Sequence, residues 1–149
     1  MVRLSLEELY REVILDHYRT PRNKGRIHPH TVALARNNPL CGDELELFLR
    51  LDGDVLEAVS FDGKGCSISL ASASMMTEKI TGAGVKEATA LAASIKRMMA
   101  GEEEGESDEL GDLVALKGVV KYPVRIKCAL LAWDTLEEAL EQGGNHPGA

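Results

Sequence analysis

The sequence has few cysteines, few aromatic side chains and no long apolar run, and each shortage excludes a class of protein. Of the 149 residues, only 4% are aromatic and only three are cysteine. An uninterrupted apolar stretch of about 18 residues or more, which a membrane-spanning helix requires, does not occur. The first residues carry acids among their apolar side chains and lack the apolar core of a secretory signal. We therefore expect a cytoplasmic protein that does not associate with membranes.

Basic residues are also fewer than acidic residues. The chain has 17 Lys and Arg against 24 Asp and Glu, which gives a formal net charge of −7. An acidic balance of this kind disfavours non-specific binding to nucleic acid. The hydrophobic content of 44% and the charged content of 28% are ordinary for a globular protein. The length fits one domain, which we expect to cover residues 1–149.

Three short strands are predicted in the first half of the chain. They cover 31–36, 44–51 and 55–61. The second strand alternates strictly, with leucine at every other position from 45 to 51, and this pattern is typical of a sheet with one buried face. Asn37-Asn38-Pro39 is expected to end the first strand, and Asp52-Gly53 matches a two-residue type I′ turn between the other two. These short connections predict an antiparallel three-stranded sheet.

Helices are predicted around this sheet, so the expected fold class is α+β. They cover 5–19, 67–81, 85–100, 112–119 and 125–141. Ser5 and Glu8 form the S-x-x-E signature of a capped helix start. Seven carboxylates and no basic residue lie between Glu102 and Asp112, which we interpret as a solvated loop or a docking surface. Residues 143–149 are expected to be a frayed tail.

The cysteines are the residues that point to chemistry. An odd number of cysteines in a cytoplasmic chain disfavours a disulfide framework, and the absence of CxxC spacing excludes a zinc ribbon. Cys66 and Cys128 are predicted near helix starts, where the helix dipole favours thiolates, and Cys41 lies in a loop.

Asp43 follows Cys41 by two residues, so both side chains can project to the same side. Three thiolates and one carboxylate would complete a tetrahedral zinc site, and soft sulfur ligands also suit iron. The alternative from spacing alone is that the cysteines are small buried apolar residues and Asp43 is a turn residue. The four histidines show no ligand spacing.

Four segments carry a resemblance to a known family. They are DHYRTPRNKG at 16–25, NNPLCGDELEL at 37–47, GKGCSISLASASMMTE at 63–78 and YPVRIKCALLAWD at 122–134. Together they resemble the family of IscU, SufU and the N-terminal domain of NifU. The resemblance implies an α+β fold with a three-stranded antiparallel sheet, and a role in iron–sulfur cluster assembly with a cysteine desulfurase. It also implies that Cys41, Asp43, Cys66 and Cys128 form the metal site.

Three departures from the IscU branch favour the SufU branch. Lys127 stands where the IscU branch has a histidine, Lys121-Tyr122-Pro123-Val124-Arg125 replaces a Leu-Pro-Pro-Val-Lys segment, and 102–119 is a branch-specific insertion. The resemblance to SufU implies a zinc-dependent acceptor of persulfide sulfur. The alternative is a scaffold that assembles a [2Fe–2S] cluster on the same ligands and passes it to apo-proteins. A purely structural zinc domain is a third alternative.

Individual roles follow from position. Cys41 is the expected sulfur acceptor, because a loop residue can leave the metal more easily than one held at a helix start. Arg125 precedes Cys128 by three residues and so shares its helical face, where it could support a thiolate; a solvated surface arginine is the alternative. Lys127 is the second candidate supporting residue.

The expected cofactor is Zn²⁺, with iron or a [2Fe–2S] cluster as alternatives. Whether the chain is itself an enzyme, as a zinc-dependent sulfurtransferase, stays open. The expected partners are a cysteine desulfurase and downstream assembly or acceptor proteins.

Overall fold

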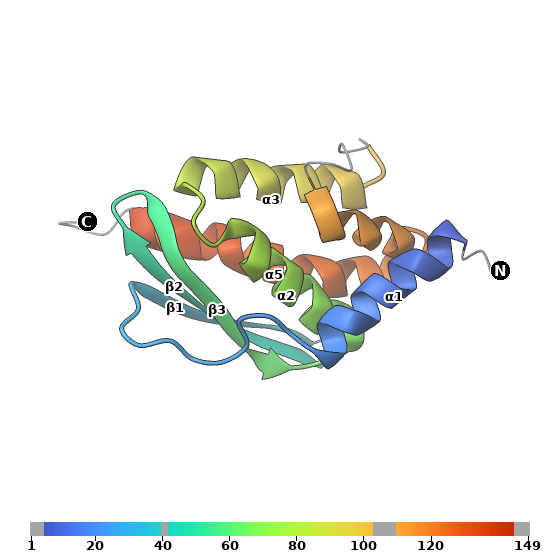
Figure 1. The fold of residues 1–149 in the computed structure, drawn as a ribbon, viewed down its shortest axis with the longest axis horizontal. Helices are drawn as coiled ribbons and strands as arrows, with labels where there is room; N and C mark the ends of the chain where they lie inside the picture. Colours follow the sequence, from blue (N-terminus) through green and yellow to red (C-terminus); the bar gives the residue numbers. More distant parts are fainter. Residues whose placement is uncertain (1–4, 40–41, 103–109, 145–149) are drawn as a thin grey trace.

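The computed structural model describes residues 5–39, 42–102 and 110–144. In this part of the chain a three-stranded antiparallel sheet is covered on one face by helices (Figure 1). The strands are β1 (Val32–Asn38), β2 (Asp43–Asp52) and β3 (Val55–Lys64), in the spatial order β1-β2-β3. The predicted α+β fold is therefore confirmed.

The helices pack as two layers on the sheet (Figure 1). Their bounds are α1 (Leu6–Arg19), α2 (Ser67–Ile80), α3 (Val85–Met99), the 3₁₀ helix η1 (Gly111–Val119) and α5 (Pro123–Gly144). The α2 and α5 helices contact the sheet directly, and α3 and η1 pack behind them. The start of α1 is capped as expected, because the Ser5 hydroxyl accepts the Glu8 N–H at 3.1 Å.

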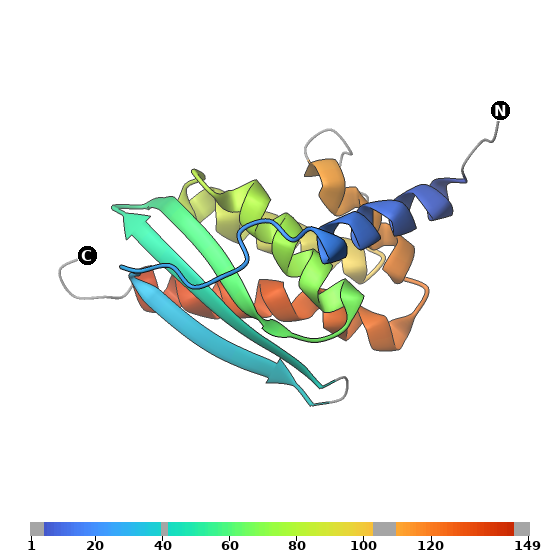
Figure 2. The ribbon, with the colours of Figure 1, turned by 60° about the horizontal axis from the view of Figure 1, so that its bottom comes forward.

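One face of the sheet is buried under the helices, and the other face is largely exposed apart from its centre. Leu45, Leu47 and Leu49 of β2 point into the core between sheet and helices and are almost fully buried. Phe48 alternates with these leucines and contacts Arg26 and His30, so it points to the other face. The segment after α1 crosses the sheet on that face (Figure 2). The Arg26 guanidinium lies 5.0 Å from the Phe48 ring centroid, and Phe48 is also completely buried. The segment between α1 and β1 thus covers an apolar residue on the face of the sheet that the helices do not cover.

The hairpin between β2 and β3 differs from the expected type I′ turn at Asp52-Gly53. Asp52 pairs with Val55, so the two loop residues are Gly53 and Asp54. Gly53 alone has a positive φ of 63°, which is the pattern of a type II′ turn with glycine at the first loop position. The prediction was wrong by one residue because Asp52 extends the ladder.

Several other element ends lie beyond their expected positions; β3, for example, ends at Lys64 rather than at 61. The β1 strand continues through Asn37 and Asn38, because these residues pair with Glu44 and Asp43 of β2. The α5 helix runs to Gly144 rather than ending at 141, so the first two residues of the expected frayed tail are helical; residues 145–149 lie outside the described part. A Cβ at Gly143 would lie 2.7 Å from Leu51, so the glycine allows this last turn to pack on the sheet. No described helix is long and apolar enough to cross a membrane.

Candidate metal centre

Cys66 caps the start of α2. It has extended dihedral angles (φ −72°, ψ 165°), and its Sγ accepts the Ser69 N–H at 3.4 Å. The side chain therefore lies at the positive end of the helix dipole, beside the backbone N–H groups of the first turn. This position confirms that the Gly-x-Gly-Cys segment ends at a helix start.

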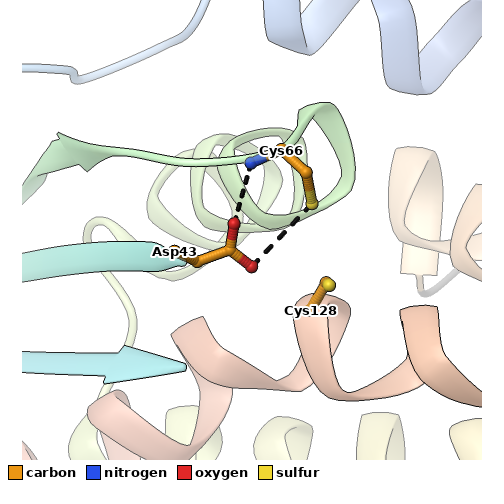
Figure 3. A group of neighbouring side chains, drawn as sticks. All are labelled: Asp43, Cys66 and Cys128. Carbon is orange, nitrogen blue, oxygen red and sulfur yellow. Dashed lines mark hydrogen bonds between the residues drawn. The ribbon is translucent and has the colours of Figure 1, made fainter. Parts of the chain in front are cut away.

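Asp43 begins β2 and is fully buried, so it is not a surface turn residue. Its Oδ1 accepts the backbone N–H of Cys66 at 2.8 Å, and its Oδ2 lies 3.9 Å from the Cys66 Sγ, which donates to it (Figure 3). A Cβ at Gly65 would lie only 2.5 Å from Asp43 Oδ1. Because Gly65, the second glycine of the Gly-x-Gly segment, has no side chain, the Asp43 carboxylate can come close enough to bond the Cys66 N–H.

Cys128 lies in the second turn of α5 and is fully buried. Its Sγ lies 3.9 Å from the Val124 carbonyl, which accepts from it. The Ser72 hydroxyl of α2 donates to the Ala129 carbonyl at 2.7 Å, and the Trp133 Nε1 donates to the same hydroxyl at 3.1 Å. These bonds fix α5 against α2 beside the cysteine.

The three side chains converge from three separate elements (Figure 3). One ligand atom each of Asp43, Cys66 and Cys128 lies within 4.8 Å of the other two. Two sulfurs and one carboxylate oxygen are a donor set that suits zinc and leaves one tetrahedral position for a further ligand. Cys41, the fourth expected ligand and the expected sulfur acceptor, lies outside the described residues, but Gly42 directly follows it and joins Asp43.

The two supporting candidates are both exposed residues of α5. The negative charge of Cys66 raises the pKa of the Arg125 guanidinium, and a hydrogen bond with Cys128 adds to the effect. Arg125 is therefore close enough to both cysteines to interact with them electrostatically. Lys127 adjoins Cys128 in sequence and adds a second positive charge to this part of α5.

Sequence reasoning missed a second group of ligand-type side chains. His17, Glu78 and Asp112 also bring one ligand atom each within 4.8 Å of one another. His17 Nε2 and Asp112 Oδ2 are 2.8 Å apart, although 95 positions separate the two residues. No local spacing in the sequence signals such a contact.

Comparisons with known proteins agree with this architecture. Residues 9–129 match the family model for the NifU-like N-terminal domain. The zinc-dependent sulfurtransferase SufU of Bacillus subtilis is 50% identical over 95% of this chain and 97% of its own length. The iron–sulfur cluster assembly scaffold protein IscU of Streptococcus pyogenes is 41% identical over 97% of this chain and 91% of its own length.

Comparison with a solved structure supports the same family. A crystal structure of a candidate iron–sulfur cluster assembly scaffold for the SUF system of Fervidobacterium islandicum aligns with a TM-score of 0.83 at 37% identity. The alignment covers 91% of this chain and 99% of that one. The chain therefore belongs to the family of NifU-like N-terminal domains, and among these relatives it is more similar to SufU than to IscU.

Proposed function

We propose that this protein is a zinc-dependent acceptor of persulfide sulfur from a cysteine desulfurase, and that it serves iron–sulfur cluster assembly. The convergence of Asp43, Cys66 and Cys128 carries the proposal, because a buried and a half-buried thiol together with a buried carboxylate are a metal-binding donor set. The name of the Bacillus subtilis relative, which is 50% identical, supports zinc and sulfur transfer as the function of that set.

Asp43, Cys66 and Cys128, together with Cys41, would hold the zinc. A bound zinc keeps its cysteine ligands deprotonated at neutral pH and undergoes no redox change. The hydrogen bond from the Cys66 N–H orients Asp43 as an outer-shell partner orients a metal ligand. The site therefore suits sulfur chemistry that must avoid uncontrolled oxidation.

The sulfur-accepting residue in this proposal is Cys41. Its thiolate attacks the terminal sulfur of the persulfide on the donor protein, so a new S–S bond forms on Cys41. The bond between that sulfur and the donor cysteine breaks, and the donor cysteine leaves as a thiolate. Electrons balance within this exchange, and no external oxidant or reductant is required. Arg125 and Lys127 supply positive charge near the site, which stabilises the anionic sulfur species, and downstream assembly or acceptor proteins then take the sulfur.

A scaffold for a [2Fe–2S] cluster is the second candidate function. The Streptococcus pyogenes relative, 41% identical, is named as such a scaffold, and thiolates also bind iron. The two functions differ in the metal that the purified protein retains and in the cysteine that receives the sulfur.

Mass spectrometry of the protein after incubation with a cysteine desulfurase and cysteine tests the proposal. We expect one added sulfur on Cys41, and we expect Cys41→Ser to abolish stimulation of the desulfurase while the two proteins still associate. A persulfide found mainly on Cys128, together with a cluster formed on iron addition, would contradict the acceptor role and favour the scaffold.

A further inference from the structure

A second convergent group lies away from the cysteines, where α1, α2 and η1 meet. His17 of α1 is completely buried, and its Nδ1 lies 2.8 Å from the Ser74 hydroxyl of α2. Its Nε2 lies 2.8 Å from Asp112 Oδ2 of η1. Glu78 follows Ser74 by one turn of α2, and its carboxylate approaches the same point.

We propose that His17, Glu78 and Asp112 bind a second divalent transition-metal ion, separate from the cysteine site. One imidazole nitrogen and two carboxylate oxygens, all within 4.8 Å, are ligands that Zn²⁺, Co²⁺ and Mn²⁺ share. The inference does not rest on the proposed sulfur transfer, because it uses none of the same side chains.

The imidazole is oriented as a metal-binding histidine would be. Ligating histidines commonly make a hydrogen bond through the ring nitrogen that does not bind the metal, and this bond fixes the ring. Ser74 makes that bond here, and the Arg22 N–H donates to the same hydroxyl at 2.8 Å and holds it in place. Nε2 therefore points at the two carboxylates from a rigid, buried ring.

The carboxylates face solvent, which gives an ion a route to the buried nitrogen. The Asp112 side chain is 53% exposed and that of Glu78 is 51% exposed. A cavity of about 270 Å³ adjoins them, lined also by Met75 and Leu113. Water can therefore fill the positions that three protein ligands leave open.

Two cationic side chains lie near this place: Arg22 beside Glu78, and Lys79 in the lining of the cavity. The Arg22 Nε lies 3.7 Å from Glu78, which is a long ion pair, while the same guanidinium hydrogen-bonds Asp16 at 2.8 Å and the Thr20 carbonyl at 3.0 Å. Glu78 is thus loosely held. An ion at Nε2 must also take the place of any proton on that nitrogen, which lies 2.8 Å from Asp112 Oδ2.

Cobalt titration of the purified protein tests the proposal, because the ligand type sets the absorption spectrum. We expect two bound equivalents of Co²⁺: one with an intense sulfur-to-cobalt charge-transfer band, and one that shows only weak ligand-field bands. Asp112→Asn and Glu78→Gln should each weaken the second equivalent at least about tenfold and leave the charge-transfer band unchanged. Asn and Gln preserve size and hydrogen bonding at half-exposed positions, and circular dichroism verifies the fold.

Glu12→Gln is the matched control, since it removes one exposed carboxylate from α1 outside the group. It should retain both equivalents. A protein that binds no Co²⁺ beyond the equivalent with the charge-transfer band would overturn the proposal, and so would a ligand-field equivalent that persists in both Asp112→Asn and Glu78→Gln. A missing charge-transfer band would count against the cysteine site alone, so the two proposals fail separately.

Discussion

Each of the two ligand clusters takes one residue from α2 and brings its ligand atoms within 4.8 Å of one another, but the clusters are built from different donors. Cys66 begins α2, and Glu78 follows 12 positions later, about 18 Å along the helix axis. At Cys66 two sulfurs and a carboxylate are buried or half-buried, whereas at Glu78 one buried imidazole meets two exposed carboxylates.

This difference teaches how one fold can separate two kinds of metal chemistry. Soft sulfur ligands in a closed site retain zinc and support sulfur exchange, and mixed nitrogen and oxygen ligands at the surface exchange ions more freely. Proximity alone is therefore a poor guide to function, and the donor atoms and their exposure decide it. The following changes test whether the two clusters act independently.

Cys66→Ser should have the largest effect on the cysteine cluster. Serine is a good helix cap, so the metal-free protein should unfold at the same temperature as the parent. Zinc affinity should fall by more than about 100-fold, because a metal ligand is lost. Competition with a chromophoric chelator measures the affinity, and calorimetry measures the unfolding temperature. Equal zinc affinity in both proteins would show that Cys66 is only a cap.

Asp43→Asn should have the next largest effect, on metal release. Asparagine keeps an oxygen for the Cys66 N–H but loses the carboxylate charge, so zinc should leave about 10- to 100-fold faster. Asp43→Ala should also lower the free energy of unfolding by about 1–3 kcal/mol, because the Cys66 N–H loses its partner. Stopped-flow chelation measures release, and Asp54→Asn in the exposed hairpin loop is the control. Unchanged release in Asp43→Asn would remove Asp43 from the ligand set.

Gly65→Ala should weaken zinc binding about tenfold without removing any ligand. The new methyl group would lie 2.5 Å from Asp43 Oδ1, so the carboxylate must move. Gly84→Ala is the matched control, because its methyl group would meet only ordinary contacts at 3.4 Å or more. If the two variants bound zinc equally well, the close approach at Gly65 would have no role in metal binding.

Ser5→Ala should have the smallest effect, and only on stability. Loss of the cap on α1 should lower the free energy of unfolding by about 1 kcal/mol, as chemical denaturation would show. Helix α1 contributes His17 to one cluster and nothing to the other, so zinc binding by the cysteines should not change. A parallel fall in zinc affinity would mean that the two clusters are coupled.

The sequence predicted those parts of the fold that local patterns control. Alternating leucines identified the buried face of β2, the Ser5 cap marked the start of α1, and the Gly-x-Gly-Cys segment placed Cys66 at a helix start. These features arise from contacts between near neighbours in the chain. The position of Cys66 at a helix start follows from these contacts, and the set of four site residues follows from the resemblance to a known family.

The parts that the sequence could not predict depend on distant contacts. Asp112 reaches His17 across 95 positions, and Ser74 reaches it across 57. The second role of Asp43, as acceptor for the Cys66 N–H, joins the start of β2 to the start of α2. The type II′ hairpin was also missed, because the pairing of Asp52 with Val55 decides which residues form the loop.

Zinc-edge X-ray absorption on protein purified without added metal tests the central claim most directly. The account predicts one zinc per chain, with three sulfurs near ~2.3 Å and one oxygen near ~2.0–2.2 Å. The oxygen is that of Asp43, and the third sulfur is that of Cys41. Protein that carries no zinc, or zinc surrounded only by nitrogen and oxygen, would contradict the account.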